Sequence, residues 1–417
     1  MEREVRGPRR KCPRGTRCGL GIGPRRGRDP RRGREDSRER RLVTVGFDKS
    51  AVDSGAADKS AVDKHTEELI DESLQEKQKQ PDGLVSTNSR RMAGLLVCLV
   101  VLAAVLLLSI AVGSKTIPFG TVIDALVNYD DSNDHVIIRD LRLPRTLLGL
   151  IVGMALGVAG GLIQAMTRNP LADPGILGVN AGAGFAMVVA VAVFGLTSIW
   201  SYIWFAFLGA VIATAIVYTL GSIGRGGATP IRLTLAGVAI GSVLGGISSG
   251  ITLLNPTAFD QMRQWNAGSL SGRSLEIVLA VAPFILIGLF LALALARQLN
   301  AVALGDDLAR SLGANITRTR ILGVIAVTLL CGAATAAAGP IGFVGLMVPH
   351  VARWFVGPDQ RWILPYTLVC SPILLLFSDV VGRIVLRPGE LQVGIVTAFI
   401  GAPVLIMLVR RSKVSGL

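Results

Sequence analysis

Charged residues within the apolar runs of this 417-residue chain are few, and they are the first candidates for chemistry. Asp379 and Arg383 stand four residues apart, a spacing that places both side chains on one face of a helix as an ion pair. A carrier driven by protons or sodium ions usually keeps ionisable groups in its membrane segments as coupling sites. Because a local pair explains Asp379, the sequence disfavours such a carrier and predicts that the energy source is another protein.

The remaining reactive residues are scattered. The sequence lacks the phosphate-binding pattern G-x-x-x-x-G-K-[ST], so we do not expect this chain to bind ATP in that way. Its three histidines, His65, His135 and His350, lie in separate segments, and its five cysteines have neither the spacing of a metal site nor that of a disulfide framework. We therefore predict no enzyme activity, no metal site and no cofactor.

Three arginines precede or open the longest patterned stretch, RLPRTLLGLIVGMALGVAGGLIQAMTRNPLADPGILGVNAG at 142–182. After Arg142 and Arg145 it continues with about 20 apolar or small residues, the length of a membrane-spanning helix. The predicted topology places Arg139, Arg142 and Arg145 outside, against the usual excess of positive charge on the cytoplasmic side. Such a departure indicates that these arginines have a use.

Composition describes the scaffold that must position these residues. Half of the chain is hydrophobic, only 5% is aromatic and 49 residues are glycine, as in a helical membrane bundle packed through small residues. The net charge of +14 does not indicate nucleic acid, because residues 1–41 hold 16 Arg and Lys against 6 Asp and Glu and the remainder lies in short loops. Membrane lipid is the expected surrounding of the apolar runs.

The apolar runs predict an all-α membrane protein of about ten transmembrane helices with both termini in the cytoplasm. Residues 90–417 form the transmembrane domain, and residues 1–89, basic and then acidic, are expected to be a disordered extension or the product of a start assigned too far upstream of Met92. The second to fifth and seventh to tenth helices can be superposed in opposite directions, as an inverted repeat. The expected spans are 92–112, 142–167, 175–194, 200–220, 233–254, 275–296, a helix ending near 338, a shorter one from Pro340 to about 354, one ending near 383, and 392–409.

Small residues recur every fourth position in two of these spans. Gly149, Gly153, Gly157 and Gly161 share one face of the second helix, where they permit close approach of another backbone. Gly237, Gly241, Gly245 and Ser249 repeat the pattern in the fifth helix.

The order RLPRT, a glycine ladder (Gly149, Gly153, Gly157 and Gly161), NPLADPG and GVNAG resembles the signature of the FecCD family. This family contains the permeases of ABC importers for iron–siderophore complexes, haem and vitamin B12. The runs at 232–241, 339–354 and 379–406 share the resemblance, and 253–270 looks most like the ferric enterobactin branch. It implies a permease for ferric siderophores in the bacterial cytoplasmic membrane, working by alternating access. The implied partners are cytosolic ABC ATPases, an extracytoplasmic binding protein and a second permease subunit, identical or paralogous. A cobalamin or haem permease is the alternative, and an ATP-independent carrier is less favoured.

The resemblance also implies site residues. Three arginines would be exposed at the outer rim and would dock carboxylates on the two lobes of the binding protein: Arg142, Arg145 and Arg383. Anchoring in the membrane interface is the alternative role. The fifth helix would line the translocation path with small, uncharged residues: Gly241, Gly245, Ser248 and Ser249. A two-turn amphipathic helix would couple to the ATPase, and its residues are Ala303, Leu304, Gly305, Asp306, Asp307, Leu308, Arg310, Leu312 and Gly313. The alternative is that this helix lies on lipid.

Overall fold

The computed structural model describes residues 87–411 except positions 114, 116, 224–228, 312 and 388. The predicted extension up to residue 86, and Leu312 of the predicted coupling helix, lie outside these described residues. Within them the chain is entirely helical, which confirms the predicted class. The first described helix, α3, starts at Asn88, and the domain boundary at residue 90 stays a prediction.

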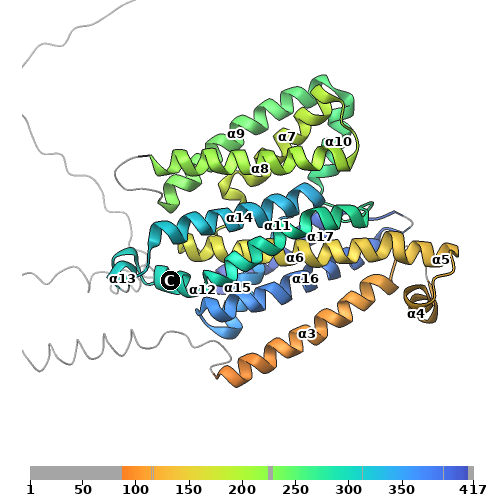
Figure 1. The fold of residues 1–417 in the computed structure, drawn as a ribbon, viewed down its shortest axis with the longest axis horizontal. Helices are drawn as coiled ribbons and strands as arrows, with labels where there is room; N and C mark the ends of the chain where they lie inside the picture. Colours follow the sequence, from red (N-terminus) through yellow and green to blue (C-terminus); the bar gives the residue numbers. More distant parts are fainter. Residues whose placement is uncertain are drawn as a thin grey trace, which may run out of the picture. The chain divides into compact units, whose positions relative to one another are not determined.

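Seven segments of the described chain are long and apolar enough to cross a membrane, and three shorter apolar helices accompany them (Figure 1). The seven are α3 (Asn88–Ala111), the continuous segment Asn133–Thr167 that ends in α6 (Leu143–Thr167), α8 (Ile199–Ser222), α9 (Pro230–Leu254), α11 (Leu275–Ala294), α14 (Ile316–Ala338) and α16 (Gln360–Val385). The shorter ones are α7 (Val179–Phe194), α15 (Val344–Val356) and α17 (Val393–Arg411). Each of these ten helices lies at the position of a predicted span, but only seven of the ten are long and apolar enough to cross a membrane, so the predicted number of about ten crossings stays a prediction.

Connecting helices gather at the two ends of the bundle. Figure 1 shows α4 (Phe119–Val127), α5 (Asn133–Val136) and α10 (Pro256–Asn266) at one end, here called the outer end. At the opposite, inner end lie α12 (Ala296–Ala303) and α13 (Asp306–Ser311). Two short helical turns, η2 (Ile137–Arg142) and η3 (Pro174–Leu177), complete the described chain. The helix α10 lies between the expected spans 233–254 and 275–296, and α12 begins where the second of these spans was expected to end.

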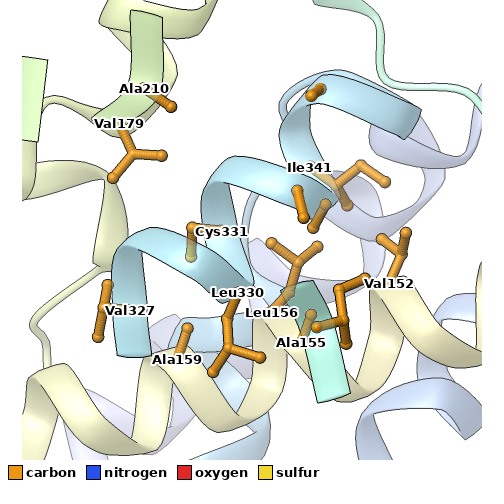
Figure 2. Close-up of a cluster of buried hydrophobic side chains, with 14 of the residues drawn as sticks. Val152, Ala155, Leu156, Ala159, Val179, Ala210, Val327, Leu330, Cys331 and Ile341 are labelled. Atoms are coloured by element: carbon orange, nitrogen blue, oxygen red, sulfur yellow. The ribbon is translucent and has the colours of Figure 1, made fainter. Parts of the chain in front are cut away.

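The centre of the bundle is formed by α6 and α14. In each, 78% of the most apolar 18-residue window is buried inside the chain. Figure 2 shows Ala159 of α6 beside Leu330 of α14 within the cluster of buried apolar side chains. Both helices contain many alanine and glycine residues, whose small side chains let helix backbones approach closely.

The glycine ladder of α6 packs against α16, as its spacing predicts. A Cβ atom at Gly153 would lie 2.6 Å from Pro372 Cα, and one at Gly157 would overlap the Ser371 hydroxyl. The ladder is therefore a backbone contact surface within this chain.

The ladder of α9 is different beyond its first residue. A Cβ at Gly237 would overlap the carbonyl of Ile176, but one at Gly241 would meet only Ala181 at 3.8 Å, and one at Gly245 would have nothing within 4 Å. Only 11% of the most apolar window of α9 is buried. This helix presents its small residues to open space rather than to a neighbouring helix of the chain.

The two ladders predict opposite responses to the same substitution. Gly157→Val should lower the free energy of unfolding by about 1–3 kcal/mol, since overfilling a packed contact forces side chains and backbone apart. Gly245→Val, which carries the same intrinsic helix cost, should leave stability close to that of the wild type. Thermal melting of the two purified variants checks this, and an equal loss in both would show that helix propensity, not packing, sets the cost.

Candidate functional site

A cluster of buried charges joins three helices at the outer end. Asp379 on α16 is completely buried, and it accepts from Arg145 of α6 with Nη2 and Oδ1 2.8 Å apart. Arg145 also donates from Nη1 to Glu390 Oε2 at 2.7 Å. Arg383, 1% exposed, forms the predicted ion pair with Asp379 and donates to the Ser109 carbonyl of α3 at 2.7 Å. We call these four charged residues, Arg145, Asp379, Arg383 and Glu390, the outer charge cluster.

Arg142 closes the end of α3. Its side chain donates to the carbonyls of Ile110 at 2.9 Å, Ala111 at 2.6 Å and Lys115 at 2.5 Å. The last carbonyls of a helix have no partner within the helix, so a guanidinium that reaches them both satisfies them and matches the helix dipole. Arg142 is 5% exposed as a result.

These contacts correct one expectation from the sequence. Arg142, Arg145 and Arg383 were expected to be exposed at a rim, but all three are buried and bonded within the chain. The reason is that carbonyls and carboxylates of α3 and α16, far away in sequence, meet them in space. Their role in docking a binding protein stays a prediction. Arg139 likewise bonds inside the chain, to the Ala125 carbonyl at 3.0 Å.

At the inner end, α13 is tied to the centre of the bundle through Asp306. Arg320 of α14 donates to Asp306 Oδ2 at 2.9 Å, and Arg168, which follows α6, forms a second ion pair with it. Arg168 also donates to the Val302 carbonyl of α12 at 2.7 Å. Burial by itself raises the pKa of Asp306, but Arg320 and Arg168 outweigh it and hold the pKa below its ordinary value of 3.8. Asp306 is therefore ionised at neutral pH.

The opposite face of α13 is open. Asp307 is fully exposed and forms a surface pair with Arg310 at 3.3 Å, while Leu304, just before the helix, and Leu308 are 56% and 49% exposed. The helix spans Asp306–Ser311, shorter than predicted, because Gly305 and Gly313 adopt left-handed backbone with φ of 115° and 80°. Asp306 thus ties the helix to the bundle, whereas Asp307 lies on its exposed face.

Three of the four predicted path residues line one cavity. Gly245, Ser248 and Ser249 border a space of about 720 Å³ between α7, α9 and α10. Gly241, one turn away on α9, does not contribute to its wall. Sequence reasoning missed the residues that α7 and α10 add, Asn180 and Arg263 among them, because only the fold brings those helices beside α9.

Comparison with known families decides the identity of this scaffold. The model of the FecCD transport family matches residues 100–411, which include the outer charge cluster, the cavity and α13. The chain belongs to the FecCD transport family. It is accordingly a multi-pass membrane protein, as its apolar helices indicate.

Two relatives match this chain over nearly the whole of their own length. The ferric enterobactin transport system permease protein FepD of Escherichia coli (strain K12) is 52% identical over 330 residues, 79% of this chain and 98% of the relative. The probable siderophore transport system permease protein YfiZ of Bacillus subtilis (strain 168) is 40% identical over 317 residues, 76% of this chain and 95% of the relative. A solved structure of a metal-chelate type ABC transporter in an inward-facing conformation matches with a TM-score of 0.68 at 27% identity, covering 76% of this chain and 98% of its own.

Proposed function

We propose that this FecCD-family chain is the permease subunit of a binding-protein-dependent ABC importer that moves ferric-siderophore complexes across the bacterial cytoplasmic membrane by alternating access. The observation that carries the proposal is the 52% identity to the ferric enterobactin permease over 98% of that relative. The cavity beside Ser248 and Ser249 supports it, because a wall of small side chains leaves room for a bulky chelate. ATP hydrolysis is assigned to separate cytosolic subunits.

The proposed topology has ten crossings with both termini in the cytoplasm, so that the inner end is cytoplasmic. Two corresponding series support an inverted repeat. In each, a deeply buried helix, α6 or α14, is followed by a break, a short helix, α7 or α15, and a long helix, α8 or α16. The predicted domain, residues 90–417, then contains the whole transport unit.

The proposed partners follow from surfaces that the chain leaves open. The face of α9 with Gly245 and Gly246 is open, so we assign it to the path shared with a second permease subunit, identical or paralogous. We assign the exposed face of α13, with Leu304, Asp307 and Leu308, to the cytosolic ABC ATPase. An extracytoplasmic binding protein would dock at the outer end, where Arg142, Arg145 and Arg383 hold the docking surface in shape from below.

The function is tested by uptake. Cells that contain this permease with its ATPase and binding protein should accumulate radiolabelled ferric siderophore, and uptake should stop when the ATPase is inactivated. Labelled cobalamin and haem, offered in parallel, should enter no faster than in cells without the permease. Uptake of cobalamin or haem in place of the siderophore would assign the chain to another cargo, and uptake that persists without the ATPase would contradict the ABC mechanism.

A further inference from the structure

One cation at the outer end stands apart from the others. Lys115 pairs with Asp134, Arg273 donates to the Ala337 carbonyl, and Arg387 donates to the Gly113 carbonyl. The four arginines described above also have partners in the protein: Arg139, Arg142, Arg145 and Arg383. Arg263 on α10 is the exception, since it has no hydrogen bond or ion pair within the part of the chain that the structure describes. Its guanidinium is exposed and available to a ligand.

Arg263 lines the cavity that also holds the path residues. Ser248, Ser249, Thr252 and Asn180 form part of the same wall, and Arg263 is the charged side chain among the lining residues. Asp260, one turn earlier on α10, is exposed but is not part of this wall. The cavity therefore has a positive charge without a carboxylate to neutralise it.

The hydroxyl groups of the wall do not compete for an anion. Ser248 donates to the Leu244 carbonyl at 2.7 Å, Ser249 to the Gly245 carbonyl at 2.9 Å, and Thr252 to the Ser248 carbonyl at 3.0 Å. With their protons directed to their own helix, these hydroxyls present oxygen lone pairs to the cavity. The free guanidinium is the strong donor that an incoming anion would meet.

A guanidinium suits this task. It is permanently charged, weakly hydrated, and donates through a planar fork of N–H groups that matches oxyanions. In a concave site with walls of low polarity, the field of one charge is concentrated toward the opening and raises the local concentration of oppositely charged ligands. Because Arg263 is exposed, such an attraction stays moderate and does not trap the ligand.

We infer that Arg263 determines cargo specificity by charge, attracting an anionic metal chelate into the cavity between α7, α9 and α10 in preference to a neutral one. This inference rests on the proposed function, since it names the charge class of the cargo. A ferric tris-catecholate complex carries net negative charge, whereas a ferric trihydroxamate complex can be neutral, so the two provide a matched pair of probes.

The test measures chelate binding directly. The permease–ATPase complex in nanodiscs, without binding protein, is titrated with each probe while quenching of tryptophan fluorescence is followed, because Trp265 borders the cavity. Arg263→Gln should weaken the affinity for the anionic complex roughly five- to tenfold. Affinity for the neutral complex should change less than about twofold, and Arg263→Lys should retain most of the preference because it keeps the charge.

Two further variants sharpen the result. Arg263→Glu should bind the anionic complex more weakly than Arg263→Gln, and Asp260→Asn, which alters the net charge of the same helix outside the cavity wall, should leave the preference unchanged. Equal weakening of both probes, or none, overturns the inference. So does a loss of binding-protein association in Arg263→Gln with unchanged chelate affinity, which would make Arg263 a docking residue. Failure of the proposed function is recognised separately, as absence of siderophore uptake by the wild type.

Discussion

Arg383→Glu is expected to prevent accumulation of folded protein. The substitution replaces a buried guanidinium by a carboxylate beside fully buried Asp379, and it removes the bond to the Ser109 carbonyl of α3. Breaking a buried ion pair by removing one partner costs about 3–5 kcal/mol, a large part of the stability of a typical domain. Fluorescence-detected size-exclusion chromatography of membrane extracts measures the outcome. An exposed Arg383, as expected from the sequence, would instead tolerate this substitution.

Two variants serve as controls for that result. Lys115→Glu reverses a charge at the same end but in an exposed pair, so it should accumulate normally. Asp379→Asn leaves Arg145 and Arg383 close together, with Glu390 as the remaining carboxylate. It should reduce the accumulation of folded protein nearly as much as Arg383→Glu. If Arg383→Glu accumulates normally and loses only binding-protein stimulation in a salt-dependent manner, the arginine is a docking residue and its structural role is refuted.

Asp306→Asn is expected to uncouple ATP hydrolysis from transport while the importer still assembles. Asp306 connects α13 to α14 through Arg320 and to the end of α6 through Arg168, so its loss frees the helix from the centre of the bundle. Charge-assisted hydrogen bonds of this kind contribute about 1.5–3 kcal/mol each, and the ratio of transported cargo to hydrolysed ATP should fall roughly tenfold. Proteoliposome uptake measured together with phosphate release gives that ratio.

The adjacent aspartate provides the matched control. Asp307→Asn changes the same charge on the exposed face, where Asp307 forms a surface pair with Arg310. It should alter ATPase affinity without lowering the transport ratio, and Asp306→Glu should restore part of the coupling. An unchanged ratio in Asp306→Asn, or an equal fall in Asp307→Asn, would remove the distinction between the two residues.

The pH dependence of this link has a definite sign. Because the folded pKa of Asp306 lies below its ordinary value of 3.8, the stabilisation is present above that value and is lost as pH falls through the folded pKa. The ion pairs of Asp306 should therefore persist between pH 8 and pH 5, and over that range their loss should not lower the wild-type ratio of transported cargo to hydrolysed ATP.

Sequence alone determined the helical class, the positions of the ten apolar segments and the family resemblance, because each depends on local composition and on the order of motifs along the chain. The spacing of Asp379 and Arg383 was also sufficient to predict their ion pair, since both lie on one helix. Gly313, predicted as the last residue of the amphipathic helix, lies just beyond α13 in left-handed backbone, which favours glycine.

Only the tertiary structure decided which charged groups are free. Arg142 and Arg263 are both arginines near the outer end, yet one is enclosed by the carbonyls of α3 and the other faces a cavity. The same holds for the glycine ladders, since a Cβ atom at Gly157 would overlap α16 and one at Gly245 would have no described neighbour within 4 Å. Spacing along a helix specifies the face on which a residue lies, but burial depends on which distant helix covers that face, and that is a property of the whole packed bundle.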